Sequence, residues 1–293
     1  MKFRFTNRLI IPFLLLLMVQ TLFAAESQKG LLWQINKPGL TPSYVFGTIH
    51  SEDARVTKLP PIVRTRFEKA SSASFEIMMD IPTMLKAAKA MFFVGEESLD
   101  KVIDKALYTQ IVNALRQYQM PAIMVKRLKP WAVVVTLSTP PNETGDFLDF
   151  MLYKKAQQLQ IPTYGLEKVE EQLAVFDDFS LADQVSLLKD TLKNLKKMPA
   201  LFDKMHKLYL ERDLTTLLKF SIEEMKSDSD NLSLVDAFYK KVVDDRNIRM
   251  VKRMEKRLQE GNAFIAIGAL HLPGKKGMLK LLQDRGYSVS AIY

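Results

Sequence analysis

The sequence contains no cysteine. This absence excludes disulfide bonds, a lipidated cysteine, a thiolate nucleophile and zinc sites built on cysteine. A glycine-rich phosphate loop, a serine-centred nucleophile elbow and a dinucleotide-binding fingerprint are also absent. The formal net charge of +9 is spread along expected helices and is not interleaved with regularly spaced aromatic residues. A nucleic-acid partner is therefore not expected.

The first 25 residues differ from the rest in composition. Lys2, Arg4 and Arg8 supply three of the nine excess positive charges, which leaves +6 for residues 26–293. Residues 9–23 are mostly apolar, and Ala24 and Ala25 offer small residues for cleavage. This pattern predicts a secretory signal peptide at residues 1–25 and an exported protein, periplasmic or secreted. The large residues three positions before either cleavage point leave an uncleaved N-terminal anchor open as an alternative.

No later segment is apolar enough to span a bilayer, so no membrane span is expected after removal of the signal. Residues 26–293 are predicted to form one domain with a helical insertion at about 82–224. The expected fold class is α/β, with a mixed central sheet flanked by many helices. The expected strands lie at 31–35, 43–49, 72–77, 161–166, 263–267 and 287–292. The first two are expected to pair as a hairpin, whereas the run Val133–Val135 fits either a strand or a buried helix.

Histidine is scarce, and two of the three histidines occupy matching contexts. The apolar run that begins at Tyr44 ends in Gly47, three residues before His50, and the run that begins at Ala263 ends in Gly268, three residues before His271. Short apolar runs of this kind are typical of buried strands. Each glycine is expected to let the backbone turn sharply. Each histidine then lies where open α/β sheets place ligands, which favours one shared site.

Two glutamates stand beside expected strands. Glu76 lies inside the run 72–77, where an ionised carboxylate is costly unless it is paired or binds a metal. The alternative is an edge strand on which Glu76 faces water. Glu167 follows the strand that ends at Leu166, and it could either join a site or stabilise the start of the next helix. The residues alone leave both alternatives open.

A long helix is predicted from Leu234 to Glu260. Arg246 lies in its apolar stripe, four residues after Val242 and four before Met250, and Asn247 lies in a similar position. An inward guanidinium needs an anionic partner, which could be Glu76, Glu167 or a group of the substrate, or the acid of a purely structural salt bridge. The third histidine, His206, has no motif around it and is interpreted as structural or exposed.

If the four strands ending near His50, Glu76, Glu167 and His271 are neighbours with one direction, the four side chains reach one edge of the sheet. Two imidazoles with one or two carboxylates suit a divalent transition metal such as Mn, Co or Zn. A catalytic metal would keep one position open for water. The alternative without a metal is acid–base chemistry by His50, with Glu76 as its orienting partner.

Several short motifs occur in a characteristic order and cover nearly everything after residue 30. They are Gly47–His50, Leu59–Pro61, Lys129–Trp131, Tyr164–Glu167, Glu170–Leu173, Asp245–Asn247 and Gly268–Gly274. With these motifs the chain resembles the TraB/GumN (Tiki-like) family, and within it the GumN-like bacterial branch. The resemblance implies a fold related to those of erythromycin esterases and ChaN-like haem-binding proteins. One departure is visible, because Phe147 stands where the family usually has the glycine of a Gly-x-Asp motif, while Asp149 is retained.

The resemblance implies that His50, Glu76, Glu167, Arg246 and His271 form the site. It places a glutamate at the end of the strand that contains Glu76, and it implies a metal-dependent protease by likeness to animal Tiki-like members. The first functional hypothesis is therefore a metal-dependent hydrolase acting on exported peptides or proteins. The second is a non-catalytic periplasmic protein that binds a peptide or a haem-like ligand. The residues do not indicate an oligomeric state.

Overall fold

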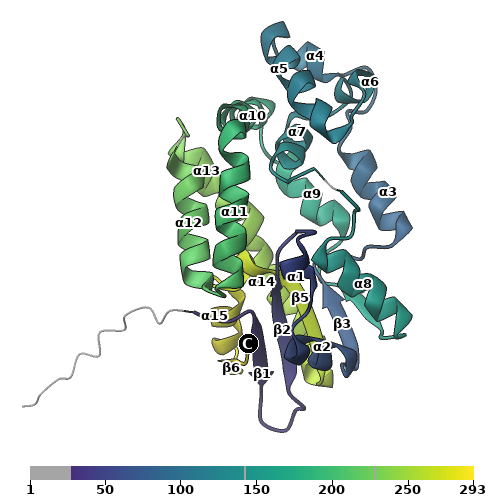
Figure 1. Ribbon diagram of the computed structural model, residues 1–293, viewed down its shortest axis with the longest axis vertical. Helices are drawn as coiled ribbons and strands as arrows, with labels where there is room; N and C mark the ends of the chain where they lie inside the picture. The colour runs from purple at the N-terminus through teal and green to yellow at the C-terminus, as the bar shows by residue number, and fades with distance from the viewer. Residues whose placement is uncertain (1–27, 142, 228) are drawn as a thin grey trace, which may run out of the picture.

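The computed structural model describes residues 28–141, 143–227 and 229–293. The predicted signal peptide at 1–25 lies outside the described residues. The described chain forms one six-stranded mixed sheet with strand order β4-β3-β5-β2-β1-β6, flanked by helices (Figure 1). This arrangement confirms the predicted α/β class. The strands are β1 (Leu32–Asn36), β2 (Ser43–Thr48), β3 (Ser72–Phe75), β4 (Thr163–Gly165), β5 (Ala263–Gly268) and β6 (Ser288–Ala291).

The six strands lie within one or two residues of the predicted segments, with one difference that matters for the site. Strand β3 ends at Phe75, so Glu76 is the first residue beyond the strand rather than a residue inside it. Strands β1 and β2 form the predicted antiparallel hairpin. On the other side of β2, strands β5, β3 and β4 follow in parallel. The carboxyl ends of these four parallel strands therefore meet at one edge of the sheet.

Helices occupy most of the remaining chain. They are α1 (Ala54–Thr57), α2 (Pro61–Glu68), α3 (Ile81–Ala90), α4 (Leu99–Val102), α5 (Lys105–Leu115), α6 (Ala122–Val125), α7 (Pro130–Leu137), α8 (Leu148–Gln158), α9 (Val169–Asp177), α10 (Leu181–Asn194), α11 (Met198–Leu210), α12 (Leu214–Ser227), α13 (Leu232–Tyr239), α14 (Asp245–Glu260) and α15 (Met278–Gln283). Short 3₁₀ turns are η1 (Arg116–Tyr118), η2 (Leu195–Lys197) and η4 (Ala269–His271). Helix α7 settles the ambiguous run at Val133. It is buried on most sides, and a helix of that kind has no polar stripe from which to recognise its period.

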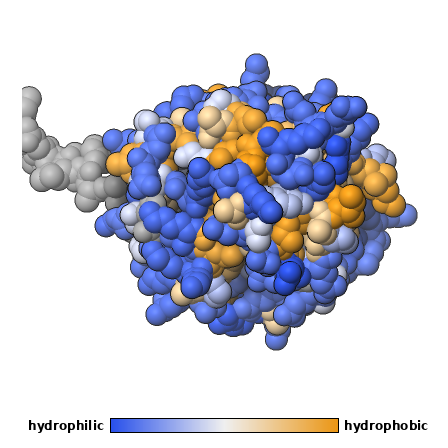
Figure 2. Space-filling model, turned by 90° about the horizontal axis from the view of Figure 1, so that it is seen from above, coloured by the Kyte–Doolittle hydropathy of each residue, from blue (hydrophilic) through white to orange (hydrophobic). Residues whose placement is uncertain are grey.

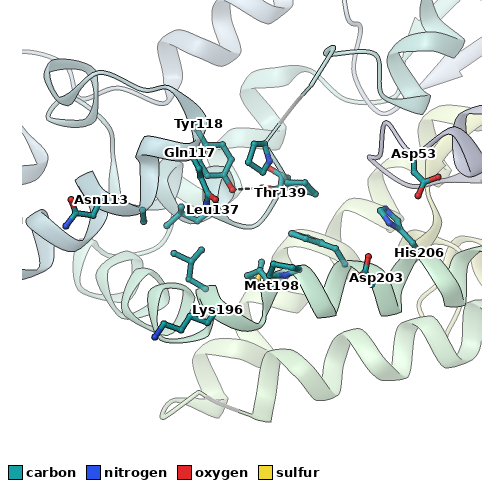
Figure 3. Close-up of a pocket in the computed structure, with 16 residues that line it drawn as sticks. Asp53, Asn113, Gln117, Tyr118, Leu137, Thr139, Lys196, Met198, Asp203 and His206 are labelled. Atoms are coloured by element: carbon teal, nitrogen blue, oxygen red, sulfur yellow. Dashed lines mark hydrogen bonds between the residues drawn. The ribbon is translucent and has the colours of Figure 1, made fainter.

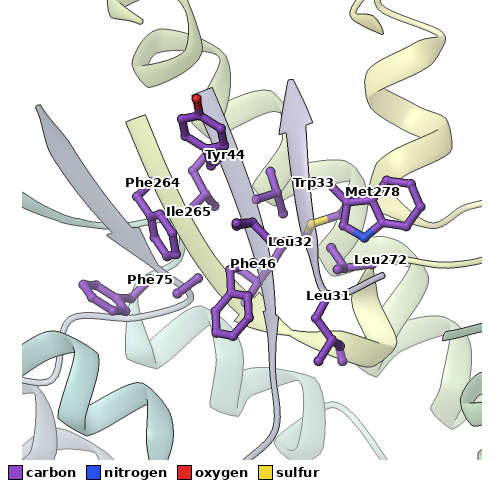
Figure 4. Close-up of a cluster of buried hydrophobic side chains, with 14 of the residues drawn as sticks. Leu31, Leu32, Trp33, Tyr44, Phe46, Phe75, Phe264, Ile265, Leu272 and Met278 are labelled. Atoms are coloured by element: carbon purple, nitrogen blue, oxygen red, sulfur yellow. The ribbon is translucent and has the colours of Figure 1, made fainter. Parts of the chain in front are cut away.

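The apolar core has two parts. The larger part surrounds the sheet, where Phe46, Phe75 and Phe264 pack with residues of the flanking helices (Figure 4). A second cluster lies among the helices between β3 and α11, and it includes Leu99, Ile111 and Leu188. In Figure 1 this helical part stands at the opposite end of the molecule from the β1–β2 turn. A separate apolar cluster lets these helices hold their own arrangement beside the sheet.

The predicted helix from Leu234 to Glu260 is present but not uniform. It begins at Leu232 as α13, passes through a π-helical turn, η3 (Lys240–Asp244), and continues as α14. A π turn inserts an extra residue into the helical repeat, and such turns are frequent at functional sites. This one directly precedes Asp245, Arg246 and Asn247. Among the described helices, none combines the length and the apolar character that crossing a membrane requires.

Candidate functional site

Glu76 is the centre of a hydrogen-bonded network at the edge where the parallel strands end. Its Oε1 accepts a hydrogen bond from the backbone N–H of Gly268 (2.8 Å), directly after the buried part of β5. Its Oε2 accepts from Arg246 Nη2 (2.6 Å) and from Gln172 Nε2 (3.0 Å). Burial by itself would raise the pKa of Glu76, but the charges of Arg246 and His271 and the hydrogen bonds from Gly268 and Arg246 together outweigh it and lower the pKa to about 2. The carboxylate is therefore ionised over the whole physiological range.

Arg246 connects Glu76 to Glu167. The Arg246 side chain points inward, as its place in the apolar stripe predicts, and the residue is only 6% exposed. Its Nε donates to Glu167 Oε2 at 2.8 Å, and its Nη1 donates to the carbonyl oxygen of Val242 in the π turn at 3.2 Å. The second oxygen of Glu167 accepts from Arg249 Nε at 2.9 Å. The guanidinium of Arg246 and both oxygens of Glu167 are thus already engaged by protein groups.

His271 lies against Glu76, held by Asn247. Its Nδ1 is 2.6 Å from Asn247 Oδ1, while Asn247 Nδ2 donates to the carbonyl oxygen of Lys276 at 2.9 Å. Because the amide oxygen can only accept, Nδ1 of His271 carries the proton and Nε2 presents a lone pair. That Nε2 is 3.8 Å from Glu76 Oε1. Burial lowers the pKa of His271 to about 4, so the ring is neutral near pH 7.

His50 and Glu76 line one cavity of about 360 Å³, here called the sheet-edge cavity. Its other lining residues are Thr48, Ile77, Met78, Met79, Thr83, Met84, Ala87, Phe147, Asp149, Phe150, Gln172 and Gly268. The ring of Phe147 packs on the His50 ring with centroids 3.6 Å apart. Burial lowers the pKa of His50, partly opposed by the negative charge of Glu76. His271 thus lies 3.8 Å from Glu76, whereas His50 lines the same cavity as this glutamate.

Asp149 and Gln172 are parts of this site that the sequence did not single out as site residues. Thr48 Oγ1 donates to Asp149 Oδ1 at 2.5 Å, so the last residue of β2 is tied to the first turn of α8. Burial raises the pKa of Asp149 to about 6. The retained Asp149 of the resembled Gly-x-Asp motif was the available signal for that residue. Gln172 lies in the motif Glu170–Leu173, but nothing in its spacing indicated a contact with Glu76.

The two motif glycines serve a purpose different from the one expected. Neither Gly47 nor Gly268 has a positive φ, so a sharp left-handed turn is not what they provide. A Cβ on Gly268 would lie 3.1 Å from Glu76 Oε1 and 3.5 Å from Cδ2 of His271. A Cβ on Gly47 would lie 2.9 Å from the side chain of Leu272. The glycines are required for close approach, which in the case of Gly268 brings Glu76 and His271 to the backbone of β5.

His206 lies apart from these residues, in a larger cavity of about 680 Å³ among the helices, here called the helical cavity. Figure 3 shows His206 and Asp203 on α11 near Asp53, with Tyr118 across the cavity donating a hydrogen bond to the carbonyl oxygen of Thr139 (2.6 Å). None of the five predicted site residues lines this cavity. His206, interpreted from the sequence as structural or exposed, is half-buried in this cavity, outside the predicted site.

The donor chemistry at the sheet edge fits a divalent metal only in part. Within residues 28–141, 143–227 and 229–293, no group of three or more His, Cys, Asp or Glu side chains is close enough together to form a complete metal site. The pair His271 and Glu76 does fit, because a neutral ring nitrogen and a carboxylate oxygen face each other with no proton between them. Two ligand atoms at about 2.1 Å from one ion lie within about 4.2 Å of each other. The 3.8 Å between His271 Nε2 and Glu76 Oε1 is within this limit. Glu167 does not fit, since both of its oxygens bind arginines.

Comparison with known proteins gives a consistent result. The sequence model of the TraB/PrgY/gumN family matches residues 31–291. Metalloprotease TIKI2 of Danio rerio is 24% identical over 317 residues, which cover 90% of the chain and 61% of that protein. Metalloprotease TIKI1 of Homo sapiens is 24% identical over 312 residues, which cover 89% of the chain and 61% of that protein. The chain thus spans less than two thirds of the length of these relatives. No solved structure matches it significantly.

Proposed function

The chain belongs to the TraB/PrgY/gumN family, and from that premise we propose that it is a metal-dependent hydrolase that cuts peptide bonds in exported peptides or proteins. Relatives named as metalloproteases support the reaction class at a distance. The proposed metal-binding residues are the facing pair His271 and Glu76, and His50, which lines the cavity beside Glu76, would have to move toward this pair to complete the set. Bound there, a divalent metal would polarise the carbonyl of the scissile bond and lower the pKa of a bound water.

The observation that carries the proposal is the orientation of His271. Asn247 fixes the ring so that the unprotonated Nε2 faces the ionised Glu76 at 3.8 Å. A lone pair facing a carboxylate oxygen in a buried place is unfavourable unless a cation lies between them. A histidine whose other nitrogen is held by a fixed acceptor is the usual arrangement of a metal ligand. This explains why Asn247 is buried beside Arg246.

We assign Arg246 and Gln172 to positioning rather than to contact with the substrate. Both donate to Oε2 of Glu76, which leaves Oε1 on the side of His271 and Gly268. Each guanidinium nitrogen of Arg246 already has a protein acceptor, which favours a positioning role over contact with an oxyanion. In this proposal Glu167 acts one step further out, by holding Arg246.

The test combines metal content with peptide digestion. The purified protein, His50→Ala, His271→Ala and Arg246→Ala are compared with Mn²⁺, Co²⁺ or Zn²⁺ added and with a chelator control. We expect the wild type to retain one of these metals and cut peptides, and both histidine variants to lose metal and turnover together. Arg246→Ala is expected to retain some metal and lose rate. Cleavage that survives both chelation and His271→Ala would exclude the metal mechanism.

The same experiment also tests the alternative function, a binding protein without catalytic activity. If no peptide is cut and a peptide or haem-like ligand co-purifies instead, the chain is a binding protein.

The proposal also includes export, because residues 1–25 carry the signal-peptide pattern. N-terminal sequencing of protein recovered from the cell envelope tests this part. An intact Met1 on protein confined to the cytoplasm would contradict it.

A further inference from the structure

The sheet-edge cavity extends beyond the polar residues of the proposed site. Figure 2 shows that the face seen from above is mostly hydrophilic, with apolar residues gathered in several separate patches. Exposed apolar side chains such as Val94 and Ile123 are ordinary on a protein surface and carry no functional argument. The sheet-edge cavity is different because its apolar lining adjoins His50 and Glu76. Apolar contacts beside a candidate reaction centre select which substrate residue is placed there.

We infer that the sheet-edge cavity is a side-chain subsite, which takes one large apolar residue of a peptide whose neighbouring bond lies at His50 and Glu76. This inference rests on the proposed function and names its substrate class. The expected residues are leucine, methionine and phenylalanine. The volume of about 360 Å³ is near the lower end of small-ligand sites, which suits one side chain rather than a folded domain.

Three of the segments that line the cavity contribute its apolar side chains. The turn after β3 contributes Met78 and Met79, helix α3 contributes Met84 and Ala87, and the start of α8 contributes Phe147 and Phe150. Methionine side chains are flexible and adapt to ligands of different shape. A lining of this kind predicts tolerance among apolar residues rather than selection of a single one.

The distribution of charge in the cavity also favours an apolar substrate residue over a charged one. Among the described residues, the lining includes no lysine or arginine, so apart from the proposed metal an acidic substrate residue would find no positively charged partner there. Its two acidic groups are already engaged, Glu76 by Arg246 and Gln172, and Asp149 by Thr48. Moving a charged side chain without a partner from water into the cavity has a large unfavourable free energy of desolvation. An apolar side chain pays no such cost and gains from leaving water.

Phe147 is held in place from outside the cavity. The two carboxylate oxygens of Glu52 accept hydrogen bonds from the backbone N–H groups of Glu143, Thr144 and Gly145, at 3.0, 2.9 and 2.7 Å. This clamp fixes the loop that leads to Phe147, whose ring lies between His50 and Phe150. The cavity wall beside His50 is therefore preorganised in the absence of substrate, which favours selection of the substrate residue by shape.

The experiment uses a set of peptides that differ in one residue beside the cut bond: leucine, methionine, phenylalanine, alanine, aspartate or lysine. We expect kcat/KM of the metal-loaded protein to be about 10–100-fold higher for the first three than for alanine or aspartate. Met84→Glu places a charge at the rim of the cavity and should reduce kcat/KM for the leucine peptide about tenfold, mainly through KM. Leu85→Glu is the matched control, since Leu85 is exposed on the same helix but does not line the cavity.

A second measurement keeps the inference independent of catalysis. Fluorescence anisotropy reports binding of the same labelled peptides to the chelator-treated protein, whether or not they are cut. Ranked binding without cleavage would support the subsite and overturn the peptidase proposal. Cleavage without an apolar preference, a preference for lysine, or equal effects of Met84→Glu and Leu85→Glu would overturn the subsite and leave the peptidase proposal standing. Neither binding nor cleavage of any peptide would overturn both.

Discussion

The sheet-edge cavity and the helical cavity both contain a histidine, but their surroundings differ. The helical cavity is the larger, and it brings His206 near Asp53 and Asp203 in an otherwise mostly apolar lining. In this cavity Asp53 accepts hydrogen bonds from Arg55, two residues further along the chain, and this contact lowers the pKa of Asp53 to about 2. The sheet-edge cavity is smaller, but its charged groups are joined across strands and helices far apart in the sequence.

This difference teaches that connected buried charge indicates a functional site better than volume does. Burying Glu76, Glu167 and Arg246 together costs free energy that an apolar core of the same size would not require. A local pair such as Asp53 and Arg55, in which the arginine is exposed and the aspartate half-buried, requires a much smaller cost. Buried charged groups with shifted pKa values, such as Glu76 here, are typical of functional sites. The predictions below test whether the two cavities differ as described.

The largest effect is expected for Glu76→Gln. If Glu76 holds the metal or activates water, its loss should reduce turnover by at least about 10²–10⁴-fold. Glu171→Gln is the matched control, because Glu171 pairs with Arg253 outside both cavities. Peptide turnover with a saturating metal concentration measures both. Similar turnover in the two variants would show that Glu76 is no more important for the reaction than a glutamate outside both cavities.

Arg246→Leu should destabilise the fold more than Arg253→Leu. The first change leaves the buried Glu76 without its arginine and leaves Glu167 with Arg249 alone, and breaking a buried pair in this way typically costs about 3–5 kcal/mol in the free energy of unfolding. The second breaks a partly exposed pair and should cost about 0–1 kcal/mol. Urea denaturation of both variants measures the difference. Equal losses would show that the buried network is not coupled to folding.

Acid should destabilise the metal-free protein through His271. The pKa of its ring falls from the usual 6.5 to about 4 on folding, so the unfolded chain binds a proton that the folded chain does not. The contribution of His271 to stability is therefore fully present above about pH 6.5 and is lost, by about 3 kcal/mol, as the pH falls to about 4, while Asp149 acts in the opposite direction over part of this range. His271→Leu should remove this contribution, so its stability should fall less than that of the wild type between these pH values. Unfolding measured across this range, with equal slopes for both proteins, would contradict the prediction.

Asp149→Asn should stabilise the metal-free protein at neutral pH. The pKa of Asp149 rises from 3.8 to about 6 on folding, so ionisation costs stability as the pH increases through this range. The variant should gain up to about 2 kcal/mol at pH 7 and nothing near pH 3. The amide oxygen can still accept from Thr48. Thermal unfolding at the two pH values measures the gain, and a loss at pH 7 would show that the ionised form is needed.

The smallest effect is expected for His206→Asn in the helical cavity. Turnover and metal content should stay within about twofold of the wild type, because His206 takes no part in the proposed site. Metal analysis and peptide digestion, run beside His271→Ala, provide the comparison. A loss equal to that of His271→Ala would place the reaction in the helical cavity.

The sequence predicted the sheet well, because its strands are short apolar runs with clear turns between them. It also predicted that Arg246 points inward, since the apolar stripe of α14 passes through that position. It did not predict the π turn before Arg246, because helical periodicity is too coarse to show one extra residue. Gln172 and Thr48 were missed for another reason. Their roles come from contacts made across the sheet edge, and spacing along the chain carries no signal for such contacts.

Strand β5 lies between β2 and β3, although it follows them by more than half the chain. During synthesis the two earlier strands cannot take their final places until residues 263–268 arrive to join them. Contacts between such distant segments form late, because closing a long loop costs entropy before any pairing compensates for it. His50 and Glu76 are thus kept apart on the growing chain, and the same strand that joins them is followed directly by His271. The candidate site can therefore be completed only after residues 263–271 have been made.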